Sequence, residues 1–182
     1  MRKDTEKNKS ILFIGGAKSG KSSHALKTGM EFIKKGGHGK GLFVATATAG
    51  DEEMQRRISL HRQERGSEWE TAEEPVNICR VVQEQNRNFD VILIDCLTLW
   101  LSNLMFGDMD IDSELSRLRQ TVAESAAPVI MVSNEVGTGI VPADPVSRKF
   151  RDMAGRMNQV MAGACTEVYF VVAGLHICMK HG

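Results

Sequence analysis

The 182-residue chain is long enough for one domain with a full hydrophobic core. Hydrophobic residues (42%) and charged residues (25%) occur in the ordinary proportion of a globular protein. Lys plus Arg (23) equals Asp plus Glu (23), so no global electrostatic field favours nucleic acid or an acidic membrane, and any phosphate binding requires a local site.

The longest apolar runs, Val91–Ile94 and Tyr169–Ala173, are too short to span a bilayer. The first residues, Met1–Ser10, are charged and lack the apolar stretch of a secretory signal, so we expect residues 1–9 to form a polar tail. The cysteines are widely spaced, which favours buried reduced thiols over a zinc site and indicates a cytoplasmic protein. They are Cys79, Cys96, Cys165 and Cys178.

Strand-length apolar runs alternate with amphipathic segments of helix length, which predicts an α/β fold with a mostly parallel sheet. The predicted strands cover Ile11–Ile14, Leu42–Ala47, Val91–Ile94, Val129–Ser133 and Val168–Ala173, with a short edge strand at Ile177–Lys180. The predicted helices cover Ser22–Lys35, Asp51–Arg65, Asp112–Ala126 and Val146–Ala164. In the last helix, Phe150, Met153, Met157 and Met161 form an apolar stripe that we interpret as core packing.

A glycine-rich segment follows the first predicted strand and precedes the first helix. It consists of Gly15, Gly16, Ala17, Lys18, Ser19, Gly20, Lys21 and Ser22, and it matches the P-loop pattern G-x4-G-K-[ST]. Glycines allow successive backbone N–H groups to face phosphate oxygens, and the helix that follows adds its positive end. In this pattern Lys21 reaches the β and γ phosphates, and the Ser22 hydroxyl ligates Mg²⁺. The segment predicts a cradle for the phosphates of GTP or ATP.

Asp95 ends the apolar strand Val91–Ile94, where P-loop enzymes carry an acid that holds the metal through water. An Asp whose only role is to cap the following helix would give the same sequence pattern. Because the phosphate cradle lies upstream, we favour Asp95 as the second residue, after Ser22, that holds Mg²⁺.

The predicted helix Asp51–Arg65 places Arg57, His61 and Arg65 along one stripe. Two guanidiniums push an imidazole between them towards its neutral, nucleophilic form. From the pattern alone, a solvated charged helix with His61 at the surface is the simpler interpretation.

Several distinctive sequence segments follow one another along the chain. They are the cradle, Ala45-Thr46-Ala47, the run Asp51–Arg65, Trp69–Pro75, Ser133–Pro142 and Phe150–Gln159. From about Ile11 to Lys180 the chain resembles the bifunctional adenosylcobinamide kinase / adenosylcobinamide-phosphate guanylyltransferase family of cobalamin synthesis. The resemblance implies a RecA-like P-loop fold for residues 10–182, a single kinase/nucleotidyltransferase domain, and assembly as a homotrimer.

The resemblance implies two reactions. Adenosylcobinamide is phosphorylated from a nucleoside triphosphate, and GMP is then transferred from GTP to that phosphate through a guanylylated histidine, a position that His61 matches. The product is adenosylcobinamide-GDP, and pyrophosphate is released. The nucleotide-contacting positions of the family fall on the cradle and on a further set in this chain. That set is Thr46, Ala47, Thr48, Gln63, Glu64, Arg65, Gly66, Glu73 and Asp95.

The chain departs from the family pattern at three positions. Lys18 stands where the family often has Arg, Asp95 where some members have Glu, and Leu60 where some have a second histidine. None of these changes removes a required group. Two alternatives remain open: a P-loop kinase of a small metabolite with one activity, and a non-enzymatic nucleotide-dependent switch. The GTPase motif Asn-Lys-x-Asp does not occur, which argues against the switch.

Overall fold

The computed structural model describes residues 9–48 and 66–182, which form seven strands and five helices. The strands are β1 (Ser10–Gly15), β2 (Gly41–Ala45), β3 (Trp69–Glu73), β4 (Val91–Asp95), β5 (Val129–Asn134), β6 (Glu167–Val172) and β7 (Leu175–His181). The helices are α1 (Lys21–Lys35), α3 (Ile78–Gln85), α4 (Leu97–Phe106), α5 (Ile111–Glu124) and α6 (Pro145–Ala164). Most of the predicted tail and the predicted helix Asp51–Arg65 lie outside the described residues.

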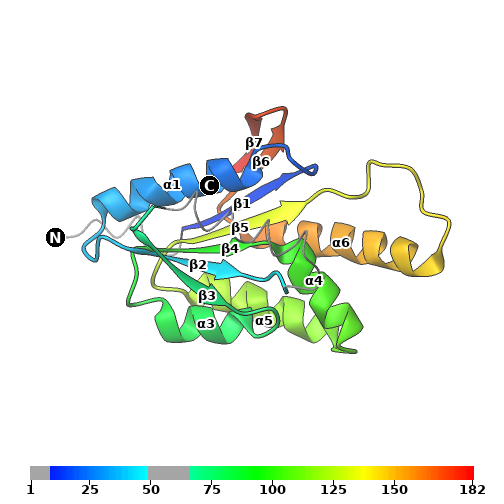
Figure 1. Cartoon of the computed structure of the whole chain (residues 1–182), viewed down its shortest axis with the longest axis horizontal. Coiled ribbons are helices and arrows are strands. Elements are labelled where there is room, and N and C mark those ends of the chain that lie inside the picture. Colours follow the sequence, from blue (N-terminus) through cyan, green and yellow to red (C-terminus); the bar gives the residue numbers. More distant parts are fainter. Residues whose placement is uncertain (1–8, 49–65) are drawn as a thin grey trace.

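All seven strands belong to one sheet with the order β3-β2-β4-β5-β1-β6-β7 (Figure 1). Every neighbouring pair is parallel except β6–β7, which is an antiparallel hairpin at one edge. The carboxyl ends of the six parallel strands therefore meet along one side of the sheet. Strand β5 lies between β1, which leads into the glycine-rich loop, and β4, which ends at Asp95.

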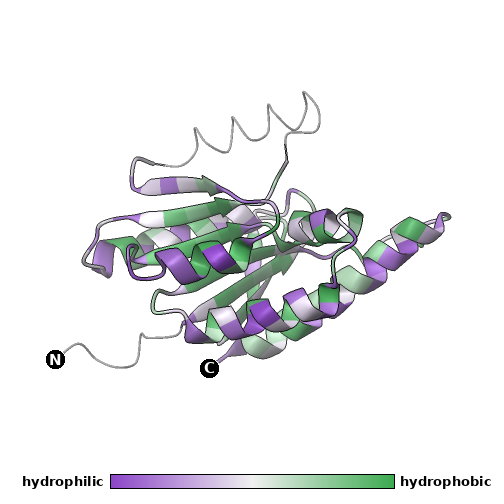
Figure 2. Cartoon of the chain, turned by 90° about the horizontal axis from the view of Figure 1, so that it is seen from below, coloured by the Kyte–Doolittle hydropathy of each residue, from purple (hydrophilic) through white to green (hydrophobic). Residues whose placement is uncertain are grey.

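Helices cover both faces of the sheet. Helix α1 lies on one face, and α3, α5 and α6 lie on the other (Figure 1). Alternate residues of the central strands face the two layers, as Phe13 packs in the α1 cluster and Leu12 in the opposite cluster. In Figure 2 the strands are mostly hydrophobic, whereas the helices alternate between hydrophobic and hydrophilic residues. None of the helices in the described ranges is long and apolar enough to cross a membrane.

The predicted strands and helices within the described residues are all present. The predicted stripe of α6 is also confirmed, because Met157 and Met161 are fully buried while Phe150 and Met153 pack against the same cluster. Two predicted strand ends were wrong. Strand β2 ends at Ala45, with residues 46–48 irregular, and β6 ends at Val172, with Ala173 in the turn.

Three elements were not predicted from the sequence. Strand β3 carries polar residues because it is an edge strand with an open side. Helix α4 is apolar around most of its circumference, so it lacks the amphipathic period that identifies a helix. Helix α3 has only eight residues, too few for a clear periodic pattern.

The expectation of buried thiols holds for Cys79, Cys96 and Cys165 and is wrong for Cys178, which is exposed. Cys178 lies on β7, and every residue of that strand is exposed. The cause is the position of β7 at one edge of the sheet, where the described residues place no strand on its outer side.

Candidate active site

The candidate site is assembled along the carboxyl edge of the sheet. The strand register aligns Glu73 of β3, Ala45 of β2 and Asp95 of β4, and it pairs Gly15 of β1 with Asn134 of β5. Asp95 is opposite Val132, two residues before Asn134. With strands about 4.8 Å apart and a rise of about 3.3 Å per residue, Asp95 lies about 12 Å from Gly15, and Glu73 about 20 Å from it. The predicted residues of β1, β2, β3 and β4 are thus brought to one edge, and Glu73 is the farthest from the cradle.

The glycine-rich loop curls between β1 and α1. Lys18 and Gly20 both have left-handed backbone conformations, with φ of 54° and 101°. The Ser19 amide donates to the Gly16 carbonyl at 3.3 Å, which closes the turn. A side chain at Gly15 would overlap the carbonyl oxygen of Val171 on the neighbouring β6, so glycine is required there for packing. The sequence therefore folds into the shape that the P-loop pattern predicts.

Lys21 begins α1, and its side chain turns back into the loop. Its Nζ donates to the Gly16 carbonyl at 2.5 Å and to Ser19 Oγ at 3.5 Å, and the residue is only 6% exposed. Burial lowers the pKa of Lys21, and the negative charge of Asp95 opposes that shift. The ammonium group therefore lies inside the glycine-rich loop, within the electrostatic reach of Asp95.

Ser22 and Asp95 fit a magnesium ion by their chemistry. Both are half-buried, one in the first turn of α1 and the other at the end of β4. Hydroxyl and carboxylate oxygens are the ligands that Mg²⁺ prefers, and an ion that is also bound by phosphates needs only one or two of them. Within residues 9–48 and 66–182, no group of three or more His, Cys, Asp and Glu could hold a metal by itself.

Thr46 joins the ends of β2 and β4. It is fully buried, and its hydroxyl donates to the Cys96 carbonyl and accepts from the Cys96 amide, both at 2.8 Å. Asn103 of α4 donates to the Thr46 carbonyl at 2.9 Å. Ala47 is half-buried and Thr48 is exposed beyond it. Thr46 thus supports the strand ends, while the two residues after it are more open to a ligand.

Cys96 follows Asp95 directly and is the thiol nearest to this edge. Burial, together with the charge of Asp95, raises the pKa of Cys96 to about 11. The thiol is therefore neutral at physiological pH, and it does not compete as a nucleophile.

A buried polar network fixes the end of β5. Ser133 Oγ donates to Asn158 Oδ1 at 2.6 Å, and Asn158 Nδ2 donates to the Asn134 carbonyl at 3.1 Å. The Asn134 amide donates to Thr98 Oγ1 at 2.7 Å. The next residue, Glu135, donates its amide to the Gly15 carbonyl at 3.0 Å, so the loop after β5 starts beside the cradle.

The tip of the β6–β7 hairpin braces the glycine-rich loop. The Gly174 amide donates to the Ser19 carbonyl at 2.9 Å, and the Gly174 carbonyl lies 2.9 Å from Nε2 of His24 in α1. The His24 ring also packs edge-on against His176 of β7. The sequence pattern singled out neither His24 nor Gly174 as a residue of the site. An Ala-Gly pair between two apolar runs does indicate a hairpin turn, but nothing local indicates what its tip contacts.

Four predicted site residues lie outside the described residues: His61, Gln63, Glu64 and Arg65. Gly66 is described, but it is not brought to the cradle. It precedes β3, and its carbonyl accepts from the Trp69 amide at 3.2 Å, so it lies at the amino edge of the sheet. A parallel β3 has to enter the sheet from that side.

The arginines of α6 have partners within the chain. Arg156 pairs with Asp112 of α5 at 3.0 Å, and Arg151 pairs with its neighbour Asp152 at 2.9 Å. Arg148 donates to the backbone carbonyls of Pro142 and Ala143. Arg148 therefore holds the end of the loop that begins at β5.

Residues 11–179 match the protein family described as cobinamide kinase / cobinamide phosphate guanyltransferase. The chain is 40% identical over 174 residues to the bifunctional adenosylcobalamin biosynthesis protein CobP of Pseudomonas aeruginosa, covering 93% of this chain and 96% of that protein. It is 37% identical over 185 residues to the proteins named CobU of Escherichia coli and of Salmonella typhimurium, covering 93% of this chain and 99% of each.

Two solved structures share the fold. The flagellar accessory protein FlaH of Methanocaldococcus jannaschii has a TM-score of 0.57 at 13% identity, covering 97% of this chain and 80% of that one. A KaiC-like protein of Pyrococcus horikoshii has a TM-score of 0.51 at 14% identity, covering 90% and 71%. At such low identities the likeness concerns the fold alone, which is the predicted α/β fold with a mostly parallel sheet.

Proposed function

Because the chain belongs to the cobinamide kinase / cobinamide phosphate guanyltransferase family, we propose that it catalyses both reactions on adenosylcobinamide. The first transfers a phosphoryl group from GTP or ATP to the substrate hydroxyl. The second transfers GMP from GTP to the new phosphate and releases pyrophosphate. The observation that carries the proposal is the buried ammonium of Lys21, which points into a loop of backbone donors at the carboxyl edge of the sheet.

Phosphoryl transfer depends on position and charge more than on covalent help from the protein. The backbone amides of Gly16–Lys21, the amino end of α1 and the Lys21 ammonium would hold the triphosphate and offset the charge that grows on its oxygens. A Mg²⁺ ion bound by Ser22, Asp95 and the phosphates would neutralise the leaving group. The loop from Asn134 to Pro142 starts next to Gly15, and we assign it to the corrinoid side of the reaction.

For the second reaction we propose His61 as the nucleophile. A nitrogen of its neutral imidazole attacks the α-phosphorus of GTP, the bond to the bridging oxygen breaks, and pyrophosphate leaves. The phosphate of adenosylcobinamide phosphate then attacks the same phosphorus and frees the histidine. Two displacements replace one difficult attack of phosphate on phosphate. Thr46–Thr48, Gln63–Arg65 and Glu73 are assigned to GTP contacts on the basis of the family resemblance.

Incubation with Mg²⁺ and GTP labelled at the α-phosphate tests this mechanism. Wild type should carry an acid-labile label after denaturing electrophoresis, His61→Ala should carry none, and the control His38→Ala should be labelled as wild type is. Label on His61→Ala would refute His61 as the nucleophile.

A second reaction mixture separates the two activities. With GTP labelled at the γ-phosphate, adenosylcobinamide should become labelled in both wild type and His61→Ala, because the kinase step does not use the histidine. Corrinoid labelling without protein labelling in wild type would identify a kinase with a single activity. Slow GTP hydrolysis without any corrinoid product would identify a nucleotide-dependent switch.

We also propose that the chain assembles as a homotrimer and works in the cytoplasm, where GTP and ATP are available. Support for assembly comes from the β6–β7 hairpin. Leu175, Ile177 and Met179 are 72%, 56% and 67% exposed at two-residue intervals, and Val172 beside them is 49% exposed. An apolar row on an unpaired edge strand is typical of a surface that another subunit covers.

A further inference from the structure

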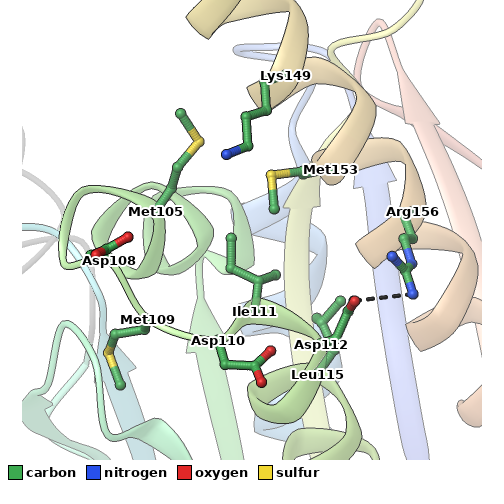
Figure 3. A pocket seen from close by; sticks show the side chains of 10 residues that line it. All are labelled: Met105, Asp108, Met109, Asp110, Ile111, Asp112, Leu115, Lys149, Met153 and Arg156. Atoms are coloured by element: carbon green, nitrogen blue, oxygen red, sulfur yellow. Dashed lines mark ion pairs between the residues drawn. The ribbon is translucent and has the colours of Figure 1, made fainter.

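A pocket of about 250 Å³ opens between α4, α5 and α6, away from the glycine-rich loop. Met105 of α4, Met109 of the following turn and Met153 of α6 contribute three thioethers to it, and Ile111 and Leu115 add aliphatic surface. Figure 3 shows the side chains of Met105, Lys149 and Met153 directed into the same hollow from two helices. A second hollow of about 500 Å³ adjoins it and shares Lys149, Met153 and Arg156. The two together run along the amino-terminal half of α6.

Two charged side chains at the rim of this pocket have no polar partner among the described residues. Arg156 is paired with Asp112, and Asp110 accepts from the Ser113 amide as the cap of α5. Neither Asp108 nor Lys149 forms a side-chain hydrogen bond or ion pair with any part of the chain that the structure describes. An acceptor and a donor thus stand beside an apolar floor, and the lining as a whole carries three aspartates against one lysine and one arginine.

The pocket lies on the carboxyl side of the sheet, which is also the side of the phosphate cradle. Helix α4 starts two residues after Asp95, and Met105 is eight residues into it, about 12 Å along the axis. On α6, Met153 precedes Asn158 by five residues, about 7.5 Å, and Asn158 binds the strand end that adjoins Gly15. Both helices therefore lead from the pocket back to the carboxyl edge of the sheet.

A cobalt corrinoid has the chemistry that this lining accommodates. Its ring bears methyl groups that pack well on flexible thioethers, and its periphery bears amide arms that need both an acceptor and a donor. With an alkyl ligand on cobalt(III) it is a cation, which suits an excess of carboxylates. Its reacting hydroxyl ends an arm of about seven bonds, roughly 8 Å when extended, so the ring can lie apart from the reacting phosphate.

We propose that the pocket between α4, α5 and α6, with the adjoining hollow, binds the corrin ring of adenosylcobinamide. Met105, Met109 and Met153 form the floor under the ring, and Asp108 and Lys149 bind its amide arms. The arm that carries the hydroxyl extends towards Asp95 and the cradle. This inference rests on the proposed function, and it assigns a location for the substrate that the cradle alone does not provide.

Binding of adenosylcobinamide to the full-length chain, measured by equilibrium dialysis with visible absorbance, tests the proposal. Met109→Lys adds a cation at a 37% exposed position on the floor, and it should raise the dissociation constant at least tenfold. Asp108→Asn removes the acceptor charge but suits the left-handed backbone at this position, and it should raise the constant about threefold. Glu124→Lys, at the far end of α5, is the control and should bind as wild type does.

Self-guanylylation with GTP serves as a separate readout in every variant, because that reaction needs no corrinoid. It should proceed at the wild-type rate and with the wild-type KM for GTP, which also shows that each variant is folded. Corrinoid binding by Met109→Lys within twofold of wild type would overturn the assigned pocket. Wild-type protein that neither binds adenosylcobinamide nor becomes guanylylated would overturn the proposed function itself.

Discussion

Gly15 is the residue at which the sheet and the phosphate loop constrain each other most closely. It ends β1, pairs with Asn134 on one side, and lies against the Val171 carbonyl on the other, so no side chain fits there. Gly16 follows it in the same loop, and a methyl group added there would meet no atom within 4 Å. Two adjacent glycines of one motif thus have different reasons to be glycine.

Gly15→Ala should therefore lower the free energy of unfolding by about 1–3 kcal/mol, because β6 must move away from the added methyl group. Gly16→Ala is the matched control and should change the free energy by less than about 0.5 kcal/mol. Urea denaturation of both variants measures the difference. Equal stabilities would show that β1 and β6 adapt to the methyl group without cost.

Among the elements, the β6–β7 hairpin has the clearest link to the site. Its tip holds the Ser19 carbonyl through Gly174, and His24 of α1 holds the tip through the Gly174 carbonyl. Two elements from opposite ends of the chain thereby fix the middle of the glycine-rich loop.

His24→Ala should raise the dissociation constant for GTP about fivefold, since one hydrogen bond that orders the cradle is lost. His24→Gln keeps a side-chain amide donor and should recover most of the affinity. His38→Ala, in an exposed loop before β2, is the control. Isothermal titration with GTP checks the series, and wild-type affinity in His24→Ala would show that the brace does not support the cradle.

The conformation of the loop between α1 and β2 is held by one carboxylate, that of Asp90. Asp90 accepts hydrogen bonds from the backbone amides of Gly37, His38, Gly39 and Lys40. Burial alone would raise the pKa of Asp90, but these amides outweigh it and hold the pKa below its usual range. A carboxylate with a lowered pKa stabilises the fold at pH values above its unfolded pKa, and it loses that contribution as the pH falls through the folded pKa.

Asp90→Asn should therefore cost roughly 1–3 kcal/mol of unfolding free energy at pH 7. The difference from wild type should shrink as the pH falls below about 4, because the carboxyl becomes protonated first in the unfolded chain and, at lower pH, in the folded one. Denaturation at a series of pH values measures this convergence. A constant difference down to pH 2 would exclude Asp90 as its source, and GTP binding should not change, since the loop lies at the opposite edge of the sheet from the cradle.

How much the sequence predicts depends on whether the signal is local. The cradle, the strand that ends at Asp95 and the stripe of α6 were predicted because each is encoded within a few turns or one strand. Helix α4 was missed because burial on several sides removes its period, and β3 because its edge position allows polar residues. The contact of Gly174 with Ser19 joins residues far apart in the chain, and no local pattern encodes it.

At the scale of the whole molecule, β7 is a partly apolar surface that the described residues leave uncovered. Its residues Leu175 and Ile177 pair with Val172 and Phe170 of β6, and together they form an apolar row on the face of the hairpin away from α1. Burying such a row against a second copy would gain about 25 cal/mol for each Å² removed from water.

Ile177→Lys combined with Leu175→Lys should convert the proposed trimer into monomers, because two charges would have to enter an apolar contact. Size-exclusion chromatography with light scattering measures the mass of each species. Lys27→Glu, on the exposed side of α1, is a charge-changing control that should leave the mass unchanged. A variant that remains trimeric would place the subunit contact elsewhere on the molecule.

The hairpin carries two surfaces. Its tip contacts the glycine-rich loop, and its exposed apolar row is the surface that we propose for contact with another subunit. A subunit that packs against β7 would order the tip before any nucleotide arrives, and it would act as an allosteric ligand of the cradle. Thermodynamic reciprocity then fixes the converse: GTP would tighten the assembly by the same factor by which assembly tightens GTP.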